Sequence, residues 1–241
     1  MITLRPSDER GHADHGWLDA RHTFSFADYR DPRWDRFGLL RVLNQDRVEP
    51  GRGFGTHGHA DMEIVTYVLD GTLEHRDSMG HSQTMRNGEV QVMSAGSGVT
   101  HSEVNPSPDD ELHLLQMWVS PEQPGTAPRY DQKDYPRAER RGRLRLVVSP
   151  DGADGSLEIG QDARMYAGLL DGDERIAQPL APGRAAWLHV AKGGLTLNDH
   201  ALRAGDGAGL VDEPGLDLTA GDDAEFVLWD LPRPAPAPAR S

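Results

Sequence analysis

The sequence predicts an all-β protein, and three observations support that class. Its 241 residues include 27 glycines and 17 prolines, which mostly separate short apolar runs. Apolar and polar residues alternate well inside these runs, as strands with two different faces require. Helical periodicity is scarce, and residues 163–171 are the only stretch that we consider for a short helix. The expected strands cover residues 37–43, 63–69, 71–76, 90–94, 112–119, 144–149, 185–190 and 226–231.

A proline- and arginine-rich segment, residues 120–145, separates two halves that resemble each other weakly. YVLDGTLEH at 67–75 and HVAKGGLTL at 189–197 each contain an aliphatic strand, a turn ending in glycine and a second strand. This repetition predicts two small β-barrels in tandem. We interpret the arginines of the connecting segment as solvated charges that counter an acidic body. These residues are Arg137, Arg140, Arg141, Arg143 and Arg145.

The composition limits the functions that this chain can have. Its formal charge is −14, and so acidic a surface should repel phosphate backbones and anionic lipid. The absence of cysteine excludes disulfides, thiolate metal sites and cysteine nucleophiles. The N-terminal residues lack the apolar core of a secretory signal, and no run approaches the length of a membrane span. We therefore expect a cytoplasmic protein that binds neither nucleic acid nor membrane.

Two histidine motifs carry the chemistry. His57-Gly58-His59 enters a strand-like run, and His101-Ser102-Glu103 follows a glycine-rich turn. Side chains two residues apart share one face of a strand, so two such pairs on neighbouring strands can aim four donors at one point. Three imidazoles and one carboxylate suit Fe(II), and also Mn, Co, Ni, Cu or Zn, while leaving coordination positions open. A lone HxH pair also occurs on solvated strands, and the second motif is what favours one divalent metal ion.

Longer segments resemble known families. The spacing of glycines and acids around the two motifs resembles the two cupin motifs, with Gly51, His57, His59, Glu63 and Gly71 in the first, and Gly88, Gly96, His101 and Asn105 in the second. Four segments narrow the resemblance to the pirins: HTFSFADYRDP at 22–32, FGLLRVLNQDRVEPGRGFGTHGH at 37–59, VTYVLDGTLEHRDSMG at 65–80 and MSAGSGVTHSEVN at 93–105. The connection after residue 115 looks like that of bacterial pirin-like proteins of the quercetin 2,3-dioxygenase type.

The resemblance implies two tandem cupin barrels, which are jelly-roll-like, with metal in the N-terminal one only. We expect a metal-binding domain at 1–125, a connection at 126–143, a degenerate cupin domain at 144–232 and a disordered tail rich in proline and alanine at 233–241. The family's metal ligands fall on His57, His59, His101 and Glu103. Gly58 stands where proline is often found between the two histidines, a difference that should affect stiffness rather than ligation.

Glu63 is expected near the metal without binding it. In many cupins the acid at this position binds the metal, but here we favour a place beside the ligands or in the pocket, since Glu103 already supplies a carboxylate. His75 and His81 flank a turn and are expected in solvent, whereas His113 could face the pocket or not. The pocket is expected to include Phe54, Met62 and Met93.

Two functions follow from the resemblance. The first is metal-dependent 2,3-dioxygenation of a flavonol such as quercetin, with release of carbon monoxide, in which Glu103 is the expected base and Glu63 the reserve. Its partners would be a small aromatic substrate and dioxygen, and family resemblance favours a monomer. The alternative is an iron-binding regulator that contacts protein partners according to the metal's redox state.

Overall fold

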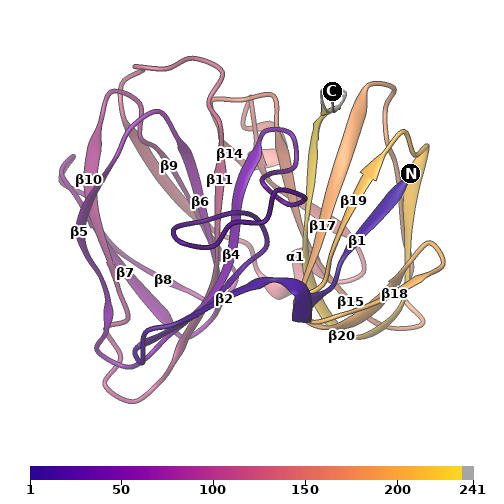
Figure 1. Ribbon diagram of the computed structural model, residues 1–241, viewed down its shortest axis with the longest axis horizontal. Coiled ribbons are helices and arrows are strands. Elements are labelled where there is room, and N and C mark those ends of the chain that lie inside the picture. Colours follow the sequence, from indigo (N-terminus) through magenta and orange to yellow (C-terminus); the bar gives the residue numbers. More distant parts are fainter. Residues whose placement is uncertain (235–241) are drawn as a thin grey trace.

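The computed structural model describes residues 1–234 and confirms the predicted all-β class. Two β-barrels lie side by side (Figure 1), with one short helix, α1 (Arg137–Arg140), near their junction. Two 3-10 turns, η1 (Ser7–Glu9) and η2 (Ala153–Gly155), complete the helical content of the part described. Barrels of this kind leave few free strand edges, which suits a chain of many short strands.

The N-terminal barrel consists of two facing sheets. Its seven-stranded sheet has the order β12-β9-β6-β11-β4-β3-β2. These strands are β12 (Arg129–Asp134), β9 (Glu89–Ser94), β6 (Glu63–Asp70), β11 (Leu112–Val119), β4 (Leu40–Val48), β3 (Leu18–His22) and β2 (Gly11–Asp14). The four-stranded sheet has the order β5-β10-β7-β8, formed by β5 (Gly53–His59), β10 (Val99–Val104), β7 (Thr72–Asp77) and β8 (Ser82–Arg86).

The C-terminal barrel is one continuous sheet that curls on itself. Its main order is β1-β19-β17-β20-β15-β13-β14, with β16 added beside β20 and β18 beside β17. Long strands β17 (Arg184–Leu197) and β20 (Gly215–Pro232) run through most of the barrel. The other members are β1 (Ile2–Arg5), β13 (Leu144–Ser149), β14 (Leu157–Glu158), β15 (Arg164–Gly172), β16 (Ile176–Pro179), β18 (His200–Arg203) and β19 (Gly207–Val211).

Two strands lie outside the barrel expected from their place in the sequence. Strand β1, at the N-terminus, pairs with β19 of the C-terminal barrel. Strand β12 lies in the expected connection, yet it pairs with β9 of the N-terminal barrel. Backbone hydrogen bonds of β1 therefore tie the N-terminal end of the chain to the C-terminal barrel.

An apolar cluster joins the barrels into one body. It contains Trp187 and Trp229 of the C-terminal barrel together with Phe24 and Met117 of the N-terminal one, all fully buried. The rings of Phe24 and Trp187 lie 4.9 Å apart, and the indole N–H of Trp229 points at the sulfur of Met117, 3.3 Å away. Because truncating a buried Phe or Trp costs about 3–5 kcal/mol, these contacts strongly favour the docked arrangement.

Two glycines at corresponding positions of the weak sequence repeat have different surroundings in the two barrels. Gly71 (φ +79°) separates β6 from β7, which lie in different sheets, whereas Gly193 (φ +64°) sits within the continuous strand β17. A Cβ at either position would lie within 2.5 Å of a backbone oxygen, that of Glu111 or of Asp222. Both turns thus require glycine, for its backbone conformation and for space.

Two expectations about the second half were wrong. The residues considered for a short helix form β15, which pairs with β13 and β20. The apolar pattern of this segment is too short to distinguish a helix from a strand. Pairing with strands on both sides decides for the strand. The arginines of the connection are not all solvated. Arg140 is 2% exposed and donates to the carboxylate of Glu225 at 2.8 Å, whereas Arg137 and Arg141 remain exposed.

The described chain has no helix long and apolar enough to cross a membrane. The tail predicted to be disordered falls mostly on residues 235–241, outside the described residues. Arg233, at its start, pairs with Asp212 at 2.7 Å and is part of the ordered chain.

Candidate metal centre

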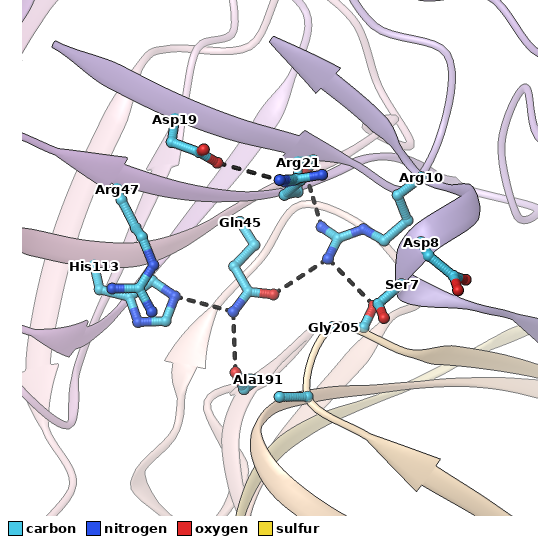
Figure 2. A pocket seen from close by; sticks show the side chains of 11 residues that line it. Ser7, Asp8, Arg10, Asp19, Arg21, Gln45, Arg47, His113, Ala191 and Gly205 are labelled. Carbon is cyan, nitrogen blue, oxygen red and sulfur yellow. Dashed lines mark hydrogen bonds and ion pairs between the residues drawn. The ribbon is translucent and has the colours of Figure 1, made fainter. Parts of the chain in front are cut away.

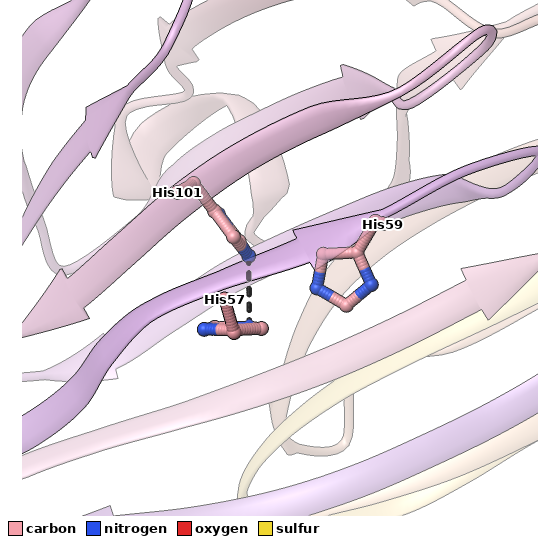
Figure 3. A group of neighbouring side chains, drawn as sticks. All are labelled: His57, His59 and His101. Atoms are coloured by element: carbon pink, nitrogen blue, oxygen red, sulfur yellow. Dashed lines mark hydrogen bonds between the residues drawn. The ribbon is translucent and has the colours of Figure 1, made fainter.

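The centre is built by strands β5 and β10, which pair antiparallel in the four-stranded sheet. His101 lies directly opposite His57, and Val99 lies opposite His59. Because side chains alternate along a strand, His57 and His59 share the face from which His101 projects. The three imidazoles therefore converge (Figure 3), with ring centroids 4.5 to 4.9 Å apart.

The nitrogen geometry fits one bound cation. Nε2 of His57 lies 3.1 Å from Nε2 of His101, close to the roughly 3 Å that separates neighbouring ligands at metal–nitrogen bonds of about 2.1 Å. Nδ1 of His57 lies 2.8 Å from the carbonyl oxygen of Gly55. That oxygen can only accept, so the ring proton is on Nδ1 and the Nε2 lone pair faces the centre.

Burial favours the neutral form of two of the imidazoles, those of His59 and His101, and metal ligands must be neutral. Burial, and then the neighbouring imidazoles, lower the pKa of His59 to about 4 and that of His101 to about 3. Neutral rings present lone pairs near neutral pH, so the donor set suits a divalent ion. Within residues 1–234, both groups of three His, Asp or Glu side chains close enough to share an ion lie in this barrel.

Glu103 is buried beside the histidines and held firmly by three donors. A bulge between His101 and Glu103 shifts the register of β10 against β5. The Glu103 carboxylate accepts hydrogen bonds from Thr66 at 3.3 Å, Gln91 at 3.3 Å and Gln116 at 2.7 Å. These donors fix the orientation of the carboxylate, as outer hydrogen bonds do for metal ligands.

His75 is a buried neighbour of the centre that the sequence reasoning placed in solvent. It is fully buried on β7, directly opposite Glu103 of β10, and groups with His101 and Glu103 within 4.8 Å. Its Nε2 lies 3.0 Å from Asp77, and its ring stacks on Tyr130 at 4.5 Å. The only sequence feature that could have indicated its role is the spacing of His75 and Asp77, which are two residues apart and so share one face of a strand. His81 also contacts Asp77, at 2.9 Å, but is partly exposed.

Glu63 was expected beside the ligands or in the pocket. Among the described residues it belongs neither to the groups of side chains that could share an ion nor to the lining of the histidine cavity described below. Its carboxylate accepts hydrogen bonds from the Ser94 hydroxyl at 2.7 Å and from the backbone N–H of Gly160 at 3.1 Å. Gly160 belongs to the second half of the chain, so Glu63 links the two barrels. Strand β6 places Glu63 opposite Ser94 of β9, in the sheet that faces the histidine-bearing one.

A cavity of about 220 Å³ opens beside the histidines. Its aromatic wall includes Phe54, as expected, together with Phe26 and Trp118. Met62 and Met93, also expected, do not line it; they belong to an apolar cluster against which Trp118 packs. Trp118 contacts His59 edge to face, with centroids 5.0 Å apart. The polar lining consists of Asn44, Asp46, Gln116 and Glu103. An apolar space with a few polar groups beside a candidate metal centre is typical of a small-molecule site.

A second cavity, of about 450 Å³, lies between the barrels and contains His113, which the sequence left open. Figure 2 shows Gln45 at its centre, 2.9 Å from Nε2 of His113 and 3.0 Å from the carbonyl of Ala191. The Gln45 oxygen accepts from Arg10 at 3.2 Å. Strand β4 separates the two cavities, with Asn44 and Asp46 facing the histidine centre and Gln45 and Arg47 facing the junction.

The fold and the centre together define a two-barrel cupin protein whose candidate metal ligands lie in the first barrel. The family model described as Pirin matches residues 3–119, and that of the quercetinase C-terminal cupin domain matches residues 146–231. A quercetin 2,3-dioxygenase of Escherichia coli K12 is 49% identical over 96% of this chain and 99% of its own length. A pirin-like protein of Caulobacter vibrioides is 43% identical over 95% and 99%.

A solved structure extends the comparison to three dimensions. The bacterial pirin YhhW of Escherichia coli, in complex with nickel(II), superposes with a TM-score of 0.92 at 48% identity, covering 97% of this chain and all of that one. The chain belongs to the pirin family, as the sequence resemblance predicted.

Proposed function

We propose that this chain is a metal-dependent dioxygenase that acts on a small aromatic substrate with an enolic hydroxyl group, of which flavonols such as quercetin are the first candidates. The observation that carries this proposal is the convergence of His57, His59 and His101 beside an aromatic-walled cavity, which His57 and His59 line. The activity named for the E. coli relative supports the same reaction class.

His57, His59, His101 and Glu103 would hold one divalent ion. The nickel complex of YhhW supports metal binding by this fold, and we favour Fe(II), although Cu, Ni, Co, Mn and Zn also suit the donor set. When bound, the ion supplies Lewis acidity toward substrate oxygens and the redox chemistry that dioxygen requires.

The protein's own groups would bind and orient the substrate. Phe26, Phe54 and Trp118 form flat apolar walls that exclude water and accept a planar ring, and such stacking contributes about 0.5–1.5 kcal/mol per aromatic pair. Polar side chains at the same cavity, including Asn44 and Gln116, can bind substrate hydroxyl and keto oxygens. This combination favours a planar, hydroxylated substrate over a charged or aliphatic one.

The test is oxygen consumption by protein loaded with each of several metals, with quercetin present and carbon monoxide measured as product. We expect the wild type to turn quercetin over with about one metal ion bound per chain. The variant His101→Ala should lose both the turnover and the bound metal. His200→Ala changes an exposed histidine of the other barrel, so its activity and metal content should match the wild type. No oxygen uptake above a metal-only blank, with every metal tried, would disprove the proposal.

The regulatory alternative has its own test. Under it, metal-loaded protein would retain a stoichiometric protein partner that metal-free protein does not. Recovery of no such partner, alongside flavonol turnover, would leave the dioxygenase as the function.

A further inference from the structure

Asp46 is a buried carboxylate on the wall of the histidine cavity whose position has no structural explanation. It is 4% exposed and lines the cavity together with His57 and His59. Its cross-strand neighbours are Ala20 on β3 and Leu114 on β11, both apolar. Its Oδ1 is buried without a hydrogen-bond partner among residues 1–234.

An unpartnered buried carboxylate destabilises a fold, so it calls for a reason. Leaving a buried polar group without a partner costs about 1–3 kcal/mol, and more when the group is charged. Native proteins satisfy most buried polar groups, and the exceptions gather at functional sites. Asn at the same place would keep the shape without the charge.

Asp46 faces the candidate metal ligands across the cavity. It projects from β4 of the seven-stranded sheet, whereas His57, His59 and Glu103 project from β5 and β10 of the four-stranded sheet. The two sheets enclose the same space, so a substrate bound at the histidine centre would extend toward Asp46. A hydroxyl group on that substrate would approach the Asp46 carboxylate, which lines the cavity.

The contrast with Glu103, the base expected from the sequence, separates two roles. Glu103 accepts hydrogen bonds from three donors, Thr66, Gln91 and Gln116, which occupy its lone pairs and fix its orientation. Asp46 has an oxygen without any such donor among the described residues. A carboxylate with donors suits ligation, and one without them suits proton transfer.

We propose that Asp46, rather than Glu103, accepts the proton of the substrate's enolic hydroxyl group. The inference rests on the proposed function for its substrate class. In the step, the substrate O–H bond breaks, its electron pair stays on the substrate oxygen, and a new O–H bond forms on the Asp46 carboxylate. The proton returns from Asp46 to the product, so the carboxylate is regenerated and no other reactant is required.

The charges around Asp46 are compatible with this role. The pKa of Asp46 is raised to about 7, mainly by burial; Arg10, on the far side of the sheet, lowers it, and Glu103 and Asp19 add smaller increases. A carboxylate that titrates near neutral pH can both take and return a proton under ordinary conditions.

The experiment counts protons released when quercetin binds the metal-loaded protein without oxygen, for wild type, Asp46→Asn and the control Asp199→Asn. Asp199 is an exposed aspartate of the C-terminal barrel. At pH 8 the wild type should release about one proton fewer than Asp46→Asn, because Asp46 retains it. At pH 5.5, where Asp46 is largely protonated, the two should release equal numbers, and Asp199→Asn should follow the wild type at both.

Turnover gives an independent readout. With normal metal content and circular dichroism, Asp46→Asn should lose about 100-fold in kcat, within the usual 10²–10⁴-fold contribution of a general base. Equal proton release at pH 8, or a kcat within twofold of wild type, would overturn the proposal. Wild-type protein that binds quercetin but consumes no oxygen would disprove the proposed function, while the proton count would still decide the role of Asp46.

If quercetin does not bind the wild type, thermal unfolding decides instead. A functional carboxylate held without partners should make Asp46→Asn more thermostable than the wild type at pH 8, with the difference shrinking as pH falls from about 7 toward 4. An unchanged or lower melting temperature at pH 8 would show that the carboxylate is structurally satisfied, and would overturn the proposal.

Discussion

Arg140 and Glu225 form a buried ion pair where the two barrels meet, with Nη1 and Oε1 2.8 Å apart and side chains 2% and 6% exposed. Arg140 belongs to α1 in the connection, and Glu225 to β20 of the C-terminal barrel. The hydroxyl of Tyr67, from β6, bonds to both. One cation thus links the connection and both barrels.

Removing Arg140 should destabilise the whole protein. Arg140→Met leaves Glu225 buried without its main partner, and we expect a loss of about 3–5 kcal/mol in the free energy of unfolding. Arg137→Met breaks only the exposed pair with Asp223 and should cost less than about 1 kcal/mol. Urea unfolding of both variants measures the difference, and equal losses would contradict the prediction.

Glu63 should prove structural rather than metal-binding. Glu63→Gln weakens the hydrogen bonds from Ser94 and Gly160, for which we expect about 1–2 kcal/mol lower stability. Metal content should stay at the wild-type level, whereas Glu103→Gln should lower it. Metal analysis after dialysis, paired with thermal unfolding, tests this, and metal loss in Glu63→Gln would show that Glu63 takes part in metal binding.

Gln116 should tune metal affinity without binding the metal. Its amide donates to Glu103 at 2.7 Å, and loss of such an orienting donor typically lowers metal affinity 10–100-fold. We expect Gln116→Leu to weaken binding about tenfold in a competition titration with a chelator. Gln83→Leu alters an exposed glutamine on β8 and should leave affinity unchanged. Wild-type affinity in Gln116→Leu would show that Glu103 needs no such support.

His113 should make stability fall in acid. Burial lowers its pKa to about 4, below the 6.5 of an exposed histidine, so the unfolded chain binds the proton more readily. The stabilisation is present above pH 6.5 and is lost as pH falls toward 4, by about 3 kcal/mol at most. Free energies of unfolding at pH 7.5, 5.5 and 4.5 should decline less steeply in His113→Gln than in the wild type. Parallel declines would contradict this, and exposed His15→Gln is the control.

Much of the fold could be read from local patterns. Alternation and glycine turns predicted an all-β chain and most core strands, because a strand's two faces impose a period that the sequence carries itself. The pairing of β1 with β19 and of β12 with β9 could not be predicted. Partners more than 30 residues apart leave no local trace in the strands that they join.

The candidate site divides in the same way. The sequence shows two pairs of donors two residues apart, His57 with His59 and His101 with Glu103. The family resemblance predicted that the two pairs share one metal ion. His75, Asp46 and Trp118 reach the same region from strands β7, β4 and β11. Their alignment depends on register and barrel curvature, which no single segment encodes.

The sequence alone determined the class of fold, the family and the donor chemistry, since these depend on residue types and on spacing within a strand. Only the tertiary structure decided that Glu63 bonds to the second half of the chain, that Arg140 is buried and that Asp46 faces the histidines. Each of these depends on which side chain meets which across two sheets, and burial and hydrogen bonding are set by those distant contacts.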